Sequence, residues 1–157
     1  MKTLIVYDSQ YGNTKLIARA IEAALSQVGE TRMLRVQAMR PESLEGVNLL
    51  ILGSPIQGWR PTVAMQTLLQ SLTAERLRGV SVACFDTRIA HPRWLAGSAA
   101  KIMVHRLQAL GAVVVAPPEG FYVEGTEGPL AAGEEARAAD WATALAVRVG
   151  EHELAQR

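Results

Sequence analysis

Short, unbroken apolar runs alternate along the chain with longer segments in which apolar residues recur every three or four positions. An unbroken apolar run is typical of a strand that is covered on both faces, as in a parallel sheet. Residues 31–37 instead alternate polar and apolar positions, which predicts a half-exposed strand near one edge of the sheet. The predicted strands are residues 3–8, 31–37, 47–52, 80–85 and 112–116, the last broken by Pro117-Pro118 and resumed at 121–123.

The segments between these runs have the apolar spacing of amphipathic helices. The predicted helices begin near Lys15, near Thr62, at Gly97-Ser98 and at Glu134. Gly29 and Gly111 end the first and third of them, and the last ends at Val149, with residues 151–157 expected to fray. Because strands alternate with helices, the sheet should be parallel and joined by right-handed crossovers.

The composition describes a globular protein. With 157 residues, 49% of them apolar and 20% charged, we expect a single domain over residues 1–157. No apolar run reaches membrane-spanning length, and the first residues lead into a strand pattern rather than a signal peptide. The single cysteine, Cys84, excludes an internal disulfide and a multi-cysteine metal site and fits the reducing cytoplasm. A net charge of +1 argues against a nucleic-acid partner.

Candidate chemistry begins directly after the first strand, in the stretch Ser9–Thr14. Main-chain N–H groups at a helix start have no intrahelical partner, and the helix dipole adds positive potential there. Ser9, Asn13 and Thr14 add side-chain donors, and Gly12 permits a turn that a Cβ would hinder. The stretch contains no Lys or Arg, so it predicts a phosphate held by dipoles and hydroxyls. The alternative is an ordinary N-cap, which favours the same residue types.

Residues 7–14, Tyr-Asp-Ser-Gln-Tyr-Gly-Asn-Thr, resemble the phosphate loop of flavodoxins, in which Ser/Thr-x-x-Gly-Asn-Thr closes around the phosphate of FMN. The resemblance covers essentially the whole chain and implies a three-layer, doubly wound α/β fold with a five-stranded parallel sheet in the order 2-1-3-4-5. It also implies an FMN cofactor in the crevice where the strand order reverses, between the first and third strands. The phosphate-binding residues would be Ser9, Gln10, Tyr11, Gly12, Asn13 and Thr14.

The loop after the third strand, residues 53–61, carries two prolines, two glycines and a tryptophan, so it is partly preorganised. In flavodoxins the corresponding loop flanks the isoalloxazine ring, and a peptide next to a glycine reorients on reduction; Gly58 resembles that glycine. A flat ligand would stack on Trp59, and the alternative is a surface loop with an incidentally exposed tryptophan. The ring-side residues implied here are Ser54, Pro55, Ile56, Gln57, Gly58 and Trp59.

The loop after the fourth strand, residues 86–94, departs from the flavodoxin pattern because it contains no tyrosine. Asp86, Thr87 and Arg88 are expected to offer main-chain contacts to the ring edge, and Trp94 either stacks on the ring or packs under the next helix. Typical flavodoxins are acidic around the flavin. Here the arginines of the two ring-side loops, Arg60, Arg88 and Arg93, predict a basic rim that attracts an acidic partner or an anionic substrate.

The flavodoxin resemblance implies an FMN-binding protein that shuttles electrons between redox partner proteins, and we expect a monomer or weak homodimer. The flavin carries the chemistry, so no catalytic side chain and no metal site are expected. The first alternative is an FMN-dependent oxidoreductase acting on a quinone or porphyrin-type substrate, which we favour less than an electron carrier. The second is a flavin-free binding module that uses the anion loop for another ligand. No G-x-G-x-x-G or P-loop lysine motif supports a dinucleotide or nucleoside triphosphate.

Overall fold

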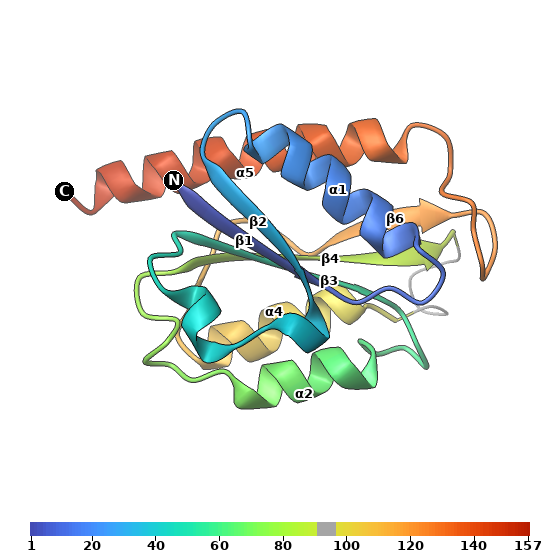
Figure 1. Cartoon of the computed structure of the whole chain (residues 1–157), viewed down its shortest axis with the longest axis horizontal. Helices are drawn as coiled ribbons and strands as arrows, with labels where there is room; N and C mark the ends of the chain where they lie inside the picture. The colour runs from blue at the N-terminus through green and yellow to red at the C-terminus, as the bar shows by residue number, and fades with distance from the viewer. Residues whose placement is uncertain (91–96) are drawn as a thin grey trace.

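The protein is a three-layer α/β sandwich in the computed structural model, which describes residues 1–90 and 97–157 (Figure 1). The central strands run in the order β2-β1-β3-β4-β5, and all the pairings are parallel, which confirms the order expected from the flavodoxin resemblance. A further strand, β6, pairs in parallel with β4. The strands are β1 (Lys2–Tyr7), β2 (Glu30–Arg35), β3 (Leu49–Pro55), β4 (Ser81–Ile89), β5 (Val113–Val114) and β6 (Glu119–Val123).

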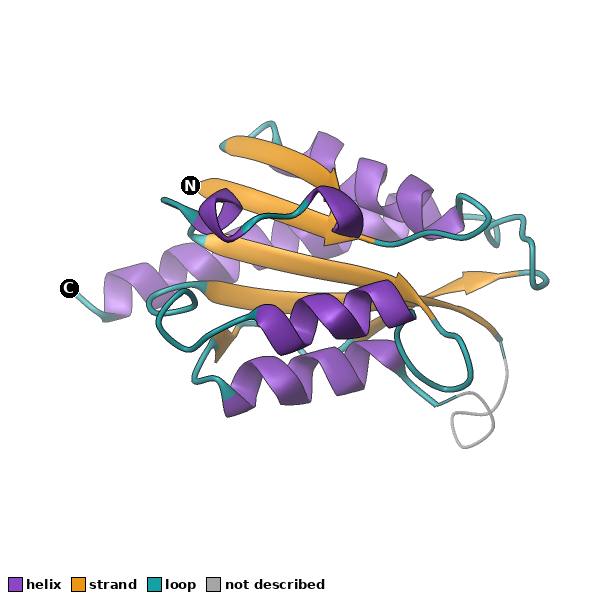
Figure 2. Ribbon diagram, turned by 60° about the horizontal axis from the view of Figure 1, so that its bottom comes forward, coloured by secondary structure: helices purple, strands orange, loops and turns teal. Residues whose placement is uncertain are grey.

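Two helices cover each face of the sheet, with α1 and α5 on one side and α2 and α4 on the other (Figures 1 and 2). The helices are α1 (Asn13–Leu25), α2 (Val63–Ser71), α4 (Ala99–Ala109) and α5 (Glu134–Ala155), and two 3-10 turns span Val36–Ala38 and Pro41–Leu44. The expectation that the last helix ends at Val149 was wrong. Gly150 interrupts the helix-forming sequence at a cost of only about 1 kcal/mol, and Glu, His, Leu and Ala continue it to Ala155.

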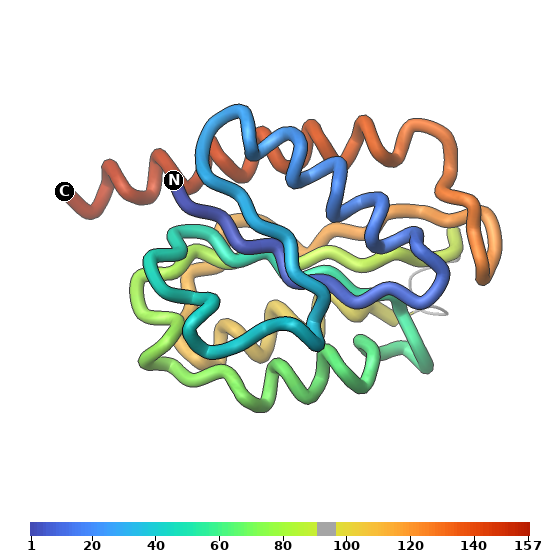
Figure 3. The backbone as a smooth tube through the Cα atoms, in the orientation of Figure 1, coloured from blue at the N-terminus to red at the C-terminus, as the bar shows by residue number. Residues whose placement is uncertain are grey.

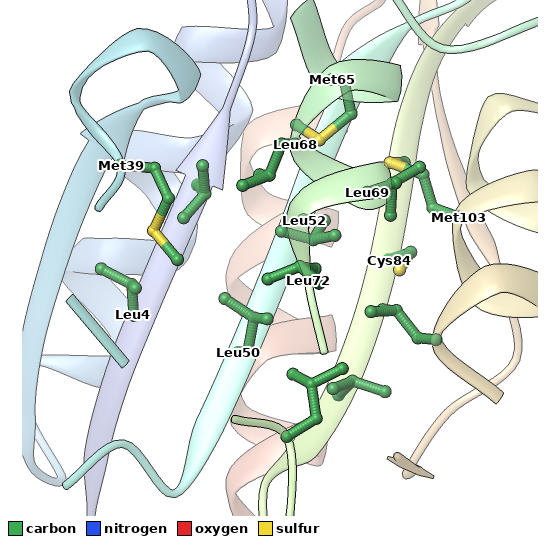
Figure 4. Packing of buried hydrophobic residues seen from close by; sticks show 14 of the residues in the cluster. Leu4, Met39, Leu50, Leu52, Met65, Leu68, Leu69, Leu72, Cys84 and Met103 are labelled. Carbon is green, nitrogen blue, oxygen red and sulfur yellow. The ribbon is translucent and has the colours of Figure 1, made fainter. Parts of the chain in front are cut away.

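Successive strand residues point to opposite faces of the sheet, so each central strand serves two cores. Leu50, Leu52 and Cys84 pack with Met65 and Met103 beneath α2 and α4 (Figure 4). The core on the other face lies under α1 and α5 and is formed by Ile5, Ile51, Phe85, Phe121, Ile17, Ile21 and Leu145, among others. Burial raises the pKa of the Cys84 thiol, which therefore stays protonated inside the first core.

Strand β4 is longer than predicted, because the polar residues 86–88 and Ile89 belong to the strand and not to a loop. The first part of β4 pairs with β5, and after Pro117-Pro118 the chain returns as β6, which pairs with residues 85–89. On its other side β4 pairs with β3 as far as Thr87 opposite Pro55. Strands on both sides therefore hold Asp86 and Thr87 in the sheet, and β6 alone pairs with Arg88, although none of the three is apolar.

Candidate functional site

The loops that leave β1, β3 and β6 and the end of β4 meet at one end of the sheet (Figure 3). A cavity of about 310 Å³ lies there, at the lower end of the size range of small-molecule sites. This is the carboxyl end of the strands beside the β1–β3 reversal, where doubly wound folds bind ligands. The cavity is lined by Ser9, Gln10, Tyr11, Asn13, Thr14, Pro55, Ile56, Gln57, Gly58, Trp59, Thr87, Arg88, Ile89, Val123 and Thr126.

The loop from Ser9 to Thr14 presents main-chain donors without partners. Gly12 precedes α1 with a φ of 93°, and the Ser9 hydroxyl accepts hydrogen bonds from the N–H groups of Gly12 at 3.0 Å and Lys15 at 3.4 Å. This arrangement leaves N–H groups that donate no hydrogen bond within the described residues, those of Gln10, Tyr11, Asn13 and Thr14. Unpartnered N–H groups at a helix start bind anions.

The side chain of Thr14 is held from across the sheet. Its Oγ1 lies 2.8 Å from the Oγ1 of Thr87, which belongs to β4. Each hydroxyl carries one donor hydrogen, so if Thr87 donates in this contact the Thr14 hydrogen remains available for a ligand. Thr14 is almost fully buried and still lines the cavity.

A hairpin after β6, residues 124–129, forms a wall that the sequence reasoning missed. Asn13 Nδ2 donates to the Glu127 carbonyl at 3.2 Å, and a Cβ on Gly128 would lie 2.7 Å from Asn13 Oδ1. The hairpin thus rests on the start of α1 and brings Val123 and Thr126 to the cavity. The sequence signal for this wall is a strand exit marked by glycines and a proline, like the loop after β3.

The loop after β3 contains a tight turn. Gln57 and Arg60 exchange two main-chain hydrogen bonds of 2.8 and 3.1 Å, and the residues between them, Gly58 and Trp59, have φ values of 54° and 65°. Two consecutive positive φ values are characteristic of a type I′ turn. Among the described residues Trp59 is the only non-glycine with a positive φ, a strained state for a bulky side chain. Trp59 is 65% exposed.

This turn is fixed to two other parts of the site. Gln57 Nε2 donates to Gln10 Oε1 at 2.6 Å, which joins the loop to the phosphate-loop candidate. Gly97, just before α4, packs against the turn so closely that a Cβ there would lie 2.7 Å from Trp59 Cβ. Ser54 supports the loop from beneath, since its buried hydroxyl accepts from the Thr62 N–H at 3.1 Å and does not line the cavity.

Asp86 also lies behind the cavity wall and not in it. Its fully buried carboxylate accepts two hydrogen bonds from Arg88, from Nε at 2.7 Å and Nη2 at 2.6 Å. The Ala100 N–H donates to it at 2.9 Å and the Ser98 hydroxyl at 3.2 Å. Burial raises the pKa of Asp86, while the Ala100 N–H and the Arg88 guanidinium act in the opposite direction.

The expected basic rim is therefore smaller than the sequence indicated. The charge of Arg88 is compensated by Asp86, whereas Arg60 is exposed. Arg93 and Trp94 lie outside the described residues. The other expected residues of the three strand exits line the cavity together, whereas Gly12, Ser54 and Asp86 do not. The structure adds Ile89, Val123 and Thr126 to the lining.

No group of metal-ligating side chains occurs within the described ranges, and no helix there is long and apolar enough to span a membrane.

A doubly wound parallel sheet in the order β2-β1-β3-β4-β5, with helices on both faces, has the flavodoxin-like fold. The chain belongs to the flavodoxin family, whose sequence model matches residues 5–141. No curated protein matches the chain in sequence.

Several solved flavodoxins share this fold over nearly their whole length. A flavodoxin from the domain Archaea aligns with a TM-score of 0.79 and 18% identity, over 96% of this chain and 99% of that one. Oxidised Flavodoxin 2 from Bacillus cereus aligns with a TM-score of 0.78 and 25% identity, over 94% and 99%. The two-electron-reduced flavodoxin of Megasphaera elsdenii gives 0.71 and 24%, over 92% and 98%.

Family membership implies a flavin cofactor, and the residues present fit one. The unpartnered N–H groups of the Ser9–Thr14 loop suit a phosphate, which needs several donors. The rest of the cavity lining is largely uncharged and includes Ile56, Trp59 and Val123, which suits a flat, mostly apolar ring.

Proposed function

We propose that the protein binds FMN in this cavity and carries electrons between redox partner proteins. The observation that carries the proposal is the group of unpartnered N–H donors between Gln10 and Thr14, within a cavity that Trp59 also lines. A ligand with a phosphate at one end and a flat ring at the other matches both features. A simple phosphate ligand would leave the Trp59 side of the cavity without a role.

The phosphate would be held without a counter-charge, by the N–H groups of the loop and the hydroxyls of Ser9 and Thr14. The start of α1 adds the positive end of the helix dipole. The hairpin 124–129 would close this end, because Asn13 holds it against the loop. Because these donors are held in place by the fold, they are expected to bind a phosphate group. The site should therefore favour FMN over riboflavin, which has no phosphate.

At the other end, Trp59 would flank the ring and the β4 residues Thr87 to Ile89 would border its edge. Bound FMN would supply the electron chemistry, since it exchanges one or two electrons. The protein's own residues position the ring and limit water access to it. The strained turn at Gly58 and Trp59 places the tryptophan at the cavity in a conformation that its neighbours impose.

We place the docking surface for redox partners at the mouth of the cavity. Tyr11 and Trp59, which line the cavity, are exposed by 47% and 65%. Exposed apolar residues around a cofactor suit the small, transient interfaces of electron-transfer proteins. The exposed charge of Arg60 supports a partner with an acidic surface, and the buried thiol of Cys84 supports work in the reducing cytoplasm.

The visible spectrum of the purified protein tests the proposal. A yellow protein whose released cofactor chromatographs as FMN, and not as FAD or riboflavin, is the expected result. A colourless protein that takes up no FMN on incubation would favour the flavin-free binding module. Rapid turnover of a quinone with a nicotinamide donor would favour an oxidoreductase over a carrier.

A further inference from the structure

A second cavity, of about 680 Å³, lies between α4 and β6. It is larger than the first cavity and falls within the size range of small-molecule sites. Its lining includes side chains of α4, Lys101, His105 and Gln108, and of β6, Glu119 and Tyr122. Arg88 lines both cavities and so stands at the wall between them.

Positive and hydrogen-bond-donating groups dominate the polar part of this lining. Lys101 and His105 are four residues apart and so share one face of α4. Both are exposed, and neither side chain makes a hydrogen bond or ion pair within the described chain. The one carboxylate in the lining, Glu119, accepts a hydrogen bond from Arg137 Nη1 at 3.1 Å, and Arg137 also pairs with Glu134.

Arg88 adds donors that are held in place. Its Nε and Nη2 are occupied by Asp86, and Nη2 also reaches the Ser98 hydroxyl at 3.1 Å. Its Nη1 donates no hydrogen bond within the described residues. The guanidinium lies against Gly120, where a Cβ would be 2.6 Å from Arg88 Nε. Two N–H groups of a fixed, planar guanidinium thus remain for a ligand.

The rest of the lining is apolar. Val104 of α4, Pro117 and Pro118 between β5 and β6, and the ring of Tyr122 provide it. Of the Lys, Arg, Asp and Glu side chains in the lining, only that of Lys101 forms no ion pair within the described chain, so a ligand with one negative charge can pair with it. A planar carboxylate also matches the geometry of a guanidinium edge.

We propose that this second cavity binds a small carboxylate with an apolar, ring-shaped body. Lys101, His105 and Arg88 Nη1 hold the carboxylate, and Tyr122 and the two prolines contact the body. The site differs in chemistry from the first cavity, which offers uncharged main-chain donors to a phosphate.

The shared residue Arg88 couples the two cavities, and this part of the inference rests on the proposed binding of FMN. A carboxylate beside Arg88 adds a negative charge near the first cavity, where Asp86 already compensates the charge of Arg88. Adding electrons to the flavin then becomes less favourable, so the carboxylate lowers the flavin's reduction potential. By linkage, the oxidised protein binds the carboxylate more tightly than the reduced protein does.

The test is a titration of the purified protein, with its flavin, by benzoate at constant ionic strength, followed by amide NMR. Benzoate should give saturable shifts at Lys101, His105 and Gly120, whereas benzamide, its uncharged analogue, should bind at least tenfold more weakly. The double substitution Lys101→Gln/His105→Gln should raise the dissociation constant of benzoate at least tenfold. Arg19→Gln, which removes a charge from an exposed position of α1, is the control and should leave it unchanged.

Shifts that do not saturate, or that survive the double substitution undiminished, would overturn the carboxylate site. A second arm measures the reduction potential with and without benzoate, and the expected shift is to a more negative value. Binding without that shift would overturn the coupling alone. A protein that contains no flavin would refute the proposed function, while the NMR titration would still decide the carboxylate site.

Discussion

The hydroxyls of Thr14 and Thr87 lie 2.8 Å apart although the residues are 73 positions apart in the chain. The contact ties the first turn of α1 to the end of β4, and both residues line the first cavity. The anion loop is thereby held to the sheet by a side chain as well as by its own main chain. A ligand bound by this loop is expected to respond to changes on either side of the contact.

Replacing Thr14 by Ala should weaken FMN binding by about 1–3 kcal/mol, because a hydrogen bond to a charged group is lost. Riboflavin, which has no phosphate, should lose far less affinity. Fluorescence titration of the apoprotein with both flavins measures the difference. Thr14→Ser retains the hydroxyl and serves as the control. Equal losses for FMN and riboflavin would show that the loop does not hold the phosphate.

Trp59 should be the tryptophan whose fluorescence FMN quenches, because it lines the cavity and Trp141 does not. Trp141 instead packs edge-to-face on Phe85 and Phe121, with ring centroids 6.1 and 5.9 Å apart. Removing FMN should restore the emission in the native protein and change little in Trp59→Phe. If the FMN-dependent quenching persists fully in that variant, the stacked residue is another tryptophan, Trp94 being the remaining one.

Gly97→Ala should destabilise the protein more than Gly79→Ala does. Both glycines have a positive φ, 62° and 75°, so each substitution incurs the left-handed penalty of about 1–2 kcal/mol. Around Gly79 an added Cβ meets nothing within 4 Å, but at Gly97 it would lie 3.1 Å from the Trp59 Cα and carbonyl oxygen. Urea unfolding of the two apoprotein variants measures the difference. Equal losses in the free energy of unfolding would mean that the turn at Trp59 shifts to accommodate an added Cβ at Gly97 without a measurable cost.

The secondary-structure elements and the start of the site were predictable because their signals are local, whereas the strand order was expected only from the flavodoxin resemblance. A buried strand, a Ser-x-x-Gly-Asn-Thr turn and a helix pattern are each recognised from neighbouring residues. The three follow one another at the start of the chain. The hairpin wall was not predictable in this way, since it depends on Asn13 reaching Glu127, 114 positions away. No local pattern specifies such a contact.

The pairing of Asp86 with Arg88 was missed for a different reason. Residues two apart on a strand point to the same side, so the pair follows once residues 86–89 are known to be strand. The prediction ended the strand at Phe85 because the apolar run ends there. The continuation depends on β6 returning beside β4 after Pro117-Pro118, which is a property of the tertiary fold.

Glu134 should stabilise the protein at neutral pH and lose its effect in acid. Its carboxylate accepts from the Tyr122 N–H at 2.7 Å and from Arg137 Nε at 2.9 Å, and the Arg137 bonds hold its pKa below the ordinary value. A lowered folded-state pKa gives stability that is full above the unfolded pKa of about 4.3 and is lost as the pH falls through the folded value. Glu134→Gln should therefore be less stable than the native protein at pH 7 by about 1–3 kcal/mol, with the gap closing below about pH 4.

Denaturant unfolding of both proteins across this pH range measures the gap. Glu135→Gln is the matched control, because Glu135 is the adjacent residue of α5 and is exposed. The control should show no gap that closes in acid. A constant difference between the native protein and Glu134→Gln from neutral to acid pH would contradict the assigned role of the ion pair.

The balance between Asp86 and Arg88 should set the reduction potential of a bound flavin. Reduction adds negative charge, which Arg88 favours and the buried carboxylate of Asp86 opposes. Asp86→Asn leaves Arg88 uncompensated and should shift the potential to a less negative value. Because the Arg88 side chain is only 12% exposed, added salt should screen this shift weakly.

Arg60→Gln should lower the potential, and salt should largely remove that effect because Arg60 is exposed. Potentiometric titration at low and high salt separates the two, with Asp140→Asn on the exposed face of α5 as the control for net charge. If Asp86→Asn folds, binds FMN and has an unchanged potential, the field of Arg88 does not reach the ring, and the charge compensation seen in the structure serves only to hold β4 against α4.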